Sequence, residues 1–277
     1  MSRLTPLPLA IAACALVLGA CQSTRRNTQL AYVERPVEQL YNQAAAELDS
    51  RDYQNAILLF EEVERQHPYS EWARKSMVMS AYASYKTRDY TTSLAAAERY
   101  LALHPGGSEA EYAYYLTALC HFDQIVDVGR DQAITERART ALNDIIRRFP
   151  ESEYAKDARI KRDMVNDQLA GKEMTVGRWY LRSNQTLSAV NRFRNVVENF
   201  QTTNHAPEAL HRLVEAYLTL GLKDQALAAG ATLGYNYPDS DWYKMSYRLL
   251  TNEGVDLEAI SASERRTLLQ RLIPGGK

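Results

Sequence analysis

Apolar positions along the chain recur with a helical spacing, and the whole pattern then returns 37 residues later. The tripeptide Arg51-Asp52-Tyr53 recurs as Arg88-Asp89-Tyr90, and the dipeptide His67-Pro68 recurs as His104-Pro105. Each unit reads as an apolar helix, a short polar turn and a second apolar helix that ends at a proline, which cannot continue a helix interior. A unit that repeats at a fixed period of this length indicates a stack of helix pairs.

The unit is similar to the tetratricopeptide repeat in the size of the residues at its key positions. The first unit has a small residue in the middle of its first helix, a small residue early in its second helix, two large apolar residues after that and a closing proline: Ala44, Ala56, Phe60, Val63 and Pro68. Small residues permit close approach of helices, and large residues fill the space between neighbouring pairs. The resemblance implies an all-α fold, an α-solenoid of about five helix pairs.

Three further units follow with less regular spacing. The third has a first helix over 111–122 and ends at Phe149-Pro150, 45 residues after the previous proline, so we expect an inserted loop over 123–136. The fourth has Ala189, Phe193 and Val196 at the signature positions, and the fifth has Ala226 and Leu233. A helix over 154–169 is predicted to link the third and fourth units.

The first twenty residues predict an export signal and a lipid anchor. An apolar run over 7–18 is too short to span a bilayer, which needs about 20 apolar residues, and it suits a secretory signal. The run ends in Leu18-Gly19-Ala20-Cys21, which resembles the lipobox of bacterial lipoproteins. The resemblance implies acylation of Cys21 and, because Gln22 follows in place of Asp, export to the outer membrane. A plain secretory signal followed by a chance cysteine is the alternative.

These boundaries divide the chain into five predicted segments. They are a signal peptide at 1–20, a lipidated tether at 21–36, repeats one to three at 37–153, a linking helix with repeats four and five at 154–253, and a terminal tail at 254–277.

Composition and motifs exclude several classes of function. The chain has 33 Lys and Arg against 34 Asp and Glu, so it lacks the basic excess of a nucleic-acid binder. After removal of the signal and acylation of Cys21, only Cys120 remains, and we expect it to be buried. Nucleophile motifs, phosphate-binding loops and metal-ligand spacings do not occur. We therefore predict a binding protein, with no enzyme activity, no cofactor and no metal.

The candidate binding surface is the inner face of the solenoid, which the first helices of the pairs form in repeats of this type. The 37-residue register places six aromatic residues there: Tyr41, Tyr82, Tyr85, Tyr112, Tyr115 and Phe122. Tyrosine offers a large apolar face and a hydroxyl, which suit an extended apolar or aromatic peptide. The alternative is that several of these rings are core packing between helices.

Five stretches, together with the lipobox and the insertion, carry a more specific resemblance. They are LYNQAAAEL at 40–48, NAILLF at 55–60, AYASYK at 81–86, VGRDQ at 128–132 and AVNR at 189–192. In this order they resemble the BamD family, lipoproteins of the outer-membrane β-barrel assembly machinery. The chain departs from that family at Gln201, which replaces a proline, and in a longer tail from Gly254 onward.

The resemblance implies a non-enzymatic scaffold, lipid-anchored on the periplasmic face of the outer membrane. It implies that the carboxy-terminal repeats bind the periplasmic POTRA domain of BamA, with Arg192 pairing with an acidic residue of that partner. It also implies that the amino-terminal repeats recognise unfolded outer-membrane β-barrel proteins through a short apolar signal that ends in an aromatic residue. A tetratricopeptide lipoprotein of another envelope system, such as a pilotin for secretin assembly or a cell-wall coordinator, is the competing interpretation.

Helical geometry adds one expectation for Arg192. One step along a helix turns about 100°. With Phe193 packed inward, Arg192 should therefore point away from the core, toward the surface.

Overall fold

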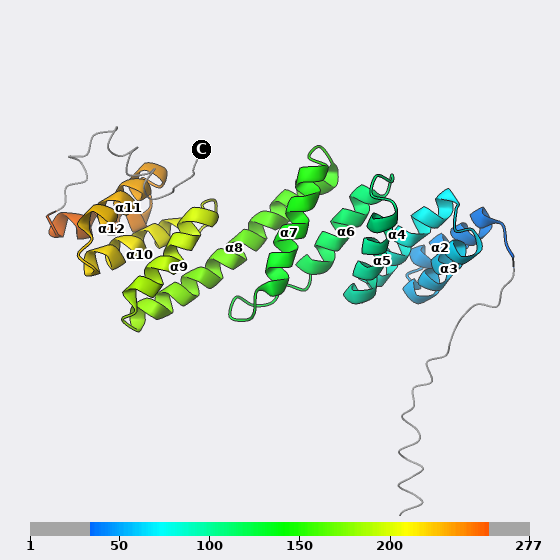
Figure 1. The fold of residues 1–277 in the computed structure, drawn as a ribbon, viewed down its shortest axis with the longest axis horizontal. Coiled ribbons are helices and arrows are strands. Elements are labelled where there is room, and N and C mark those ends of the chain that lie inside the picture. Colours follow the sequence, from blue (N-terminus) through cyan, green and yellow to red (C-terminus); the bar gives the residue numbers. More distant parts are fainter. Residues whose placement is uncertain (1–33, 255–277) are drawn as a thin grey trace, which may run out of the picture.

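A computed structural model describes residues 34–254, which form a row of packed helices (Figure 1). This described part contains eleven helices and no strand, so the predicted all-α solenoid is confirmed. The helices are α2 (Val37–Asp49), α3 (Tyr53–Gln66), α4 (Glu71–Lys86), α5 (Tyr90–Leu103), α6 (Ala110–Phe122), α7 (Ala133–Arg148), α8 (Glu153–Arg182), α9 (Thr186–Asn199), α10 (Ala206–Thr219), α11 (Lys223–Asn236) and α12 (Asp241–Asn252). Cys21 and the predicted signal peptide lie outside the described residues, as does the tail beyond Gly254.

Each helix packs on the next one along the chain, which gives five pairs from α2/α3 to α10/α11 and a final α12. The first helices of neighbouring pairs also touch, α2 with α4, α4 with α6, and α6 with α8. Figure 1 shows the pairs following one another along the long axis of the molecule. None of the helices in residues 34–254 is long and apolar enough to cross a membrane.

The recurring Arg-Asp-Tyr tripeptide is explained by the turn between the two helices of a pair. Arg51 and Arg88 take left-handed backbone conformations, with φ of 67° and 62°. The aspartate that follows each arginine caps the second helix, because the Asp52 side chain accepts the backbone N–H of Asn55, and Asp89 does the same for Thr92. Such caps satisfy an N–H that has no partner within the helix. The recurrence of the tripeptide is therefore explained by the turn that it makes.

The small and large signature residues form the core between the helices. Ala44, Ala56, Phe60 and Val63 are completely buried in the first pair. In the second pair the position of Val63 is held by Tyr100, which is also completely buried. The size pattern in the sequence thus corresponds to packing contacts.

Two predicted boundaries were wrong. The helix expected over 154–169 runs from Glu153 to Arg182, so one 30-residue helix is both the link and the first helix of the fourth pair. Gly171 and Gly177 do not end it, because both are buried where neighbouring side chains press against the helix. The inserted loop ends at Gln132 and not at 136, because α7 already begins at Ala133.

The inserted loop is fixed against α8 by side chains that hold its backbone. The Gln168 amide donates to the Val126 carbonyl at 2.8 Å, and the Lys172 ammonium donates to the Gly129 carbonyl at 3.2 Å. Because α8 also packs on α6 and α7, the loop completes the contact between the third and fourth pairs.

Candidate partner-binding surfaces

Six aromatic rings lie on the first helices α2, α4, α6 and α8, as one pair across α2 and α4 and one group of four across α4, α6 and α8. Together we call them the aromatic row. They are Tyr41, Trp72, Tyr82, Tyr112, Tyr115 and Tyr154. The ring centroids of Tyr41 and Trp72 lie 4.7 Å apart, and those of Tyr115 and Tyr154 lie 4.9 Å apart. Tyr112 lies between its neighbours, 6.3 Å from Tyr82 and 5.4 Å from Tyr154. These separations are those of favourable aromatic pairs.

All six aromatic residues predicted for the inner face are half-buried. Tyr115 and Phe122 pack against the large core cluster, whereas Tyr41, Tyr82, Tyr85 and Tyr112 pack against the smaller clusters of the amino-terminal pairs. Each residue thus combines a core contact with partial access to solvent.

Trp72 and Tyr154 were not among the aromatic residues predicted for this face. Trp72 lies in the first turn of α4, outside the rows that the repeat register compared. Tyr154 lies at the start of α8, in the segment interpreted only as a link. Carrying the register through the first turn of every first helix would have found both.

Two hydroxyl groups near the aromatic row are fixed by carboxylates. The Tyr85 hydroxyl donates to Asp123 at 2.6 Å, and the Tyr115 hydroxyl donates to Asp157. Lys161 also donates to Asp157, at 2.7 Å. Burial and then the hydrogen bond to a carboxylate raise the pKa of both tyrosine hydroxyls, so each stays a donor at neutral pH. These hydrogen bonds fix the positions of α4, α6 and α8 relative to one another.

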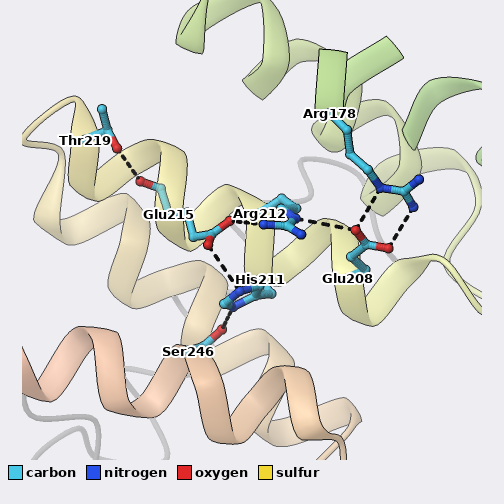
Figure 2. A network of polar contacts seen from close by, with 7 residues as sticks. All are labelled: Arg178, Glu208, His211, Arg212, Glu215, Thr219 and Ser246. Carbon is cyan, nitrogen blue, oxygen red and sulfur yellow. Dashed lines mark hydrogen bonds and ion pairs between the residues drawn. The ribbon is translucent and has the colours of Figure 1, made fainter. Parts of the chain in front are cut away.

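The first helices of the carboxy-terminal half carry a different kind of surface, made of ion pairs. Figure 2 shows a network that joins α8, α10 and α12, which we call the charged network: Arg178, Glu208, His211, Arg212, Glu215 and Ser246. Both Nε and Nη2 of Arg178 donate to Glu208, at 2.9 and 2.8 Å. Burial alone would raise the pKa of Glu208, but the hydrogen bonds from Arg178 and Arg212 hold it below its usual value. The network therefore favours the charged state of the carboxylate.

The other end of the charged network reaches α12 through a buried histidine. Arg212 donates to Glu215 at 2.7 Å, and Nε2 of His211 lies 3.5 Å from the same carboxylate. On its other side, Nδ1 of His211 lies 2.8 Å from the Ser246 hydroxyl (Figure 2). The His211 ring also lies on Trp242, with centroids 5.2 Å apart. The network thus fixes the last helix against α10.

Arg192 lies on α9, next to the completely buried Phe193. Its side chain is 43% exposed, as the helical spacing predicts. Its Nη1 lies 3.2 and 3.3 Å from the two carboxylate oxygens of Glu173 on α8. No pattern in the sequence predicted the contact between Arg192 and Glu173.

Cys120 is buried, as expected, and its thiol contacts the Ser93 hydroxyl at 3.2 Å. Burial raises the pKa of this thiol to about 11. The group is therefore protonated at neutral pH, whereas a nucleophilic cysteine acts as the thiolate. Among residues 34–254 no group of three His, Cys, Asp or Glu side chains is arranged to hold a metal ion.

Comparisons with known proteins identify close relatives over most of the chain. The family model YfiO, described as an outer membrane lipoprotein, matches residues 33–233. The chain is 51% identical over 262 residues to the outer membrane protein assembly factor BamD of Caulobacter vibrioides, covering 94% of this chain and 86% of that protein. It is 40% identical over 250 residues to BamD of Rickettsia prowazekii, covering 90% and 98%. BamD of Neisseria meningitidis serogroup A is 34% identical over 244 residues, covering 84% and 90%.

Solved structures also match, and one of them shows low overall similarity. It is a thermophilic tetratricopeptide-repeat protein of Thermus thermophilus, which aligns with a TM-score of 0.38 and 18% identity. The alignment covers 78% of this chain and 100% of that structure.

Proposed function

This chain belongs to the BamD family of outer membrane protein assembly factors, and on that premise we propose that it is a non-enzymatic scaffold of the β-barrel assembly machinery. It binds the periplasmic POTRA domain of BamA through its carboxy-terminal repeats. It receives unfolded outer-membrane β-barrel proteins through its amino-terminal repeats. Acylated Cys21 holds it on the periplasmic face of the outer membrane.

The observation that supports this proposal is a change in side-chain chemistry along the first helices of the pairs, from aromatic to charged. Those at 37–153, with the start of α8, present aromatic rings packed in tilted pairs. Those at 154–253 present the charged network. A row of rings with partly exposed faces suits a short apolar peptide that ends in an aromatic residue. Beside this network, the exposed guanidinium of Arg192 on α9 suits a folded partner that offers a carboxylate. We propose that the two tasks are divided between these segments.

Purification of the full chain from membranes in mild detergent tests the assembly. BamA in near-equal amount supports the proposed scaffold. A secretin or a Tol component in its place would instead support an adaptor of another envelope system.

A double substitution, Tyr82→Ala with Tyr85→Ala, tests the peptide surface. It removes the ring on which Tyr112 packs and the hydroxyl that binds Asp123. Crosslinking to a peptide with the barrel signal should fall, while binding of BamA stays at the wild-type level. The control is Leu103→Ala, since Leu103 is 60% exposed at the end of α5, and it should change neither. Loss of BamA binding before loss of peptide crosslinking would contradict the division into two segments.

A further inference from the structure

Three arginines on α8 and α9 differ in how much of the guanidinium is already engaged. A guanidinium can meet a carboxylate along an edge, with two parallel N–H donors. In Arg178 the Nε–Nη2 edge is occupied by Glu208, at 2.9 and 2.8 Å. In Arg194 the same edge is occupied by Glu198, at 3.2 and 2.7 Å. In these two arginines the Nε–Nη2 edge is therefore already taken.

Arg192 is different. Only its Nη1 is engaged, by Glu173, and its Nε and Nη2 have no partner among the described residues. The side chain is also 43% exposed, so a group from another molecule can reach it. Of these three arginines, only Arg192 still has its Nε–Nη2 edge open to a carboxylate.

Glu173 is well placed to fix the orientation of the Arg192 guanidinium. Its side chain is only 17% exposed. It lies on the part of α8 that packs on α9, where the Gly177 backbone approaches the Phe193 ring. Because Glu173 lies on this rigid contact, its carboxylate holds Nη1 of Arg192 in one place. The Arg192 side chain would otherwise sample many rotamers. The Arg192 side chain is therefore already partly ordered in the free protein, so binding of a partner costs less conformational entropy.

We propose that Glu173 is a positioning residue for Arg192. It holds the guanidinium by Nη1, and the open Nε–Nη2 edge then receives a carboxylate of the partner. The inference rests on the proposed function, in which that partner is BamA.

The first variant tests the proposed function on its own. Arg192→Glu reverses the charge and should greatly weaken binding of the full chain to BamA, while the thermal melt followed by circular dichroism stays near that of the wild type. A Lys in place of the contacting acid of BamA should restore part of the binding. The matched control is Arg194→Glu, which should bind nearly as the wild type does, because Arg194 is already occupied. Unchanged binding of BamA by the Arg192→Glu variant would show that Arg192 does not contact BamA.

The second pair of variants tests the positioning role. Glu173→Ala should weaken BamA binding by about three- to tenfold, the effect of ordering one long side chain at an interface. Glu173→Gln keeps an oxygen acceptor for Nη1 and should lose less. Glu198→Ala, which frees Arg194, is the matched control and should have little effect. Wild-type or tighter binding by Glu173→Ala would overturn the proposal. If Glu173→Ala does not fold, the same comparison is made with Glu173→Gln, and unchanged or tighter binding by that variant overturns it.

A double substitution separates positioning from a general structural effect. In an Arg192→Ala background, Glu173→Ala should cause no further loss of BamA binding, since there is no guanidinium left to position. An equal loss in both backgrounds would mean that Glu173 supports the fold of α8 and α9, and it would overturn the positioning role while leaving the Arg192 contact intact.

Discussion

Single residues decide how closely neighbouring helices approach. A Cβ atom added at Gly177 would lie 2.6 Å from the ring of Phe193, which is completely buried. The fourth pair therefore depends on a glycine that α8 carries in its interior, even though glycine is a poor helix former. Gly234 on α11 has the same relation to Tyr243 on α12, at 2.5 Å.

Gly177→Ala should destabilise the protein. Alanine favours the helix by about 1 kcal/mol over glycine, but overpacking a core contact costs about 1–3 kcal/mol, and the buried Phe193 ring has little room to move. Denaturant unfolding should show a lower midpoint. Phe193→Leu in the same chain should recover part of the loss. The control is Gly106→Ala, which meets nothing within 4 Å, and an equal loss there would contradict the explanation.

The charged network predicts a dependence of stability on pH. Because the pKa of Glu208 is lowered in the folded state, its contribution is present above the unfolded value, about 4.3, and is lost as the pH falls through the native value. Glu208→Gln should therefore be less stable than the wild type at pH 7, and the difference should narrow below about pH 4. Urea unfolding of both proteins at several pH values measures this difference in the free energy of unfolding.

The control for that experiment is Glu153→Gln. Glu153 is 84% exposed and pairs only with Lys156 in its own helix, and such pairs contribute little. A difference of equal size at pH 7 for both variants would show that the network adds nothing beyond a surface ion pair.

At the scale of the elements, the turns in four of the five helix pairs adopt the same backbone conformation with different residues, the exception being the inserted loop of the third pair. Arg51, Arg88, Asn184 and Gly221 all have positive φ at this turn, from 57° to 74°. A left-handed conformation costs a residue with a Cβ about 1–2 kcal/mol and costs glycine very little. The first two turns tolerate an arginine because an aspartate cap follows immediately.

Gly221→Ala should lower the free energy of unfolding by about 1 kcal/mol, because the turn would then hold an alanine in the left-handed region. The reverse change, Arg88→Gly, should leave the stability equal or raise it. Thermal melts of both variants check the pair. A stabilising effect of Gly221→Ala would mean that the turn changes conformation at little cost.

At the scale of the whole molecule, the core is continuous toward the carboxy-terminal end and divided toward the amino-terminal end. One cluster of buried residues runs from Ala118 to Leu250, whereas the first pairs have three smaller clusters. In a solenoid each unit contacts only its neighbours. We therefore expect the described body to keep its packing without the anchor at Cys21.

Cys21→Ser should separate anchoring from folding. The lipobox predicts that labelled palmitate enters the wild-type chain and not the variant. The thermal melt of the body should be the same in both, since the core begins with α2. Palmitate in the variant would contradict Cys21 as the acylation site. A lower melting temperature of the variant would contradict the expectation that the helical body folds without the anchor.

The sequence by itself determined the repeat, the helical class and the identity of the buried positions. These follow from local rules: the spacing of apolar residues sets the helical face, a proline ends a helix, and the alternation of small and large residues at 44, 56, 60 and 63 records which face is packed. The 37-residue register also placed five tyrosines and a phenylalanine on the first helices. Family membership, carried by stretches such as AVNR at 189–192, was equally visible in the sequence.

Only the tertiary structure decided which side chains meet across helices. Glu173 and Arg192 are 19 residues apart, and Arg178 and Glu208 are 30 apart. Their pairing depends on the rotation and separation of whole helices. The uninterrupted course of α8 was decided in the same way, since its glycines could be judged only against the Phe193 and His205 side chains they accommodate. A periodic pattern fixes the face of a helix, but the packing of many residues at once fixes where that face lies.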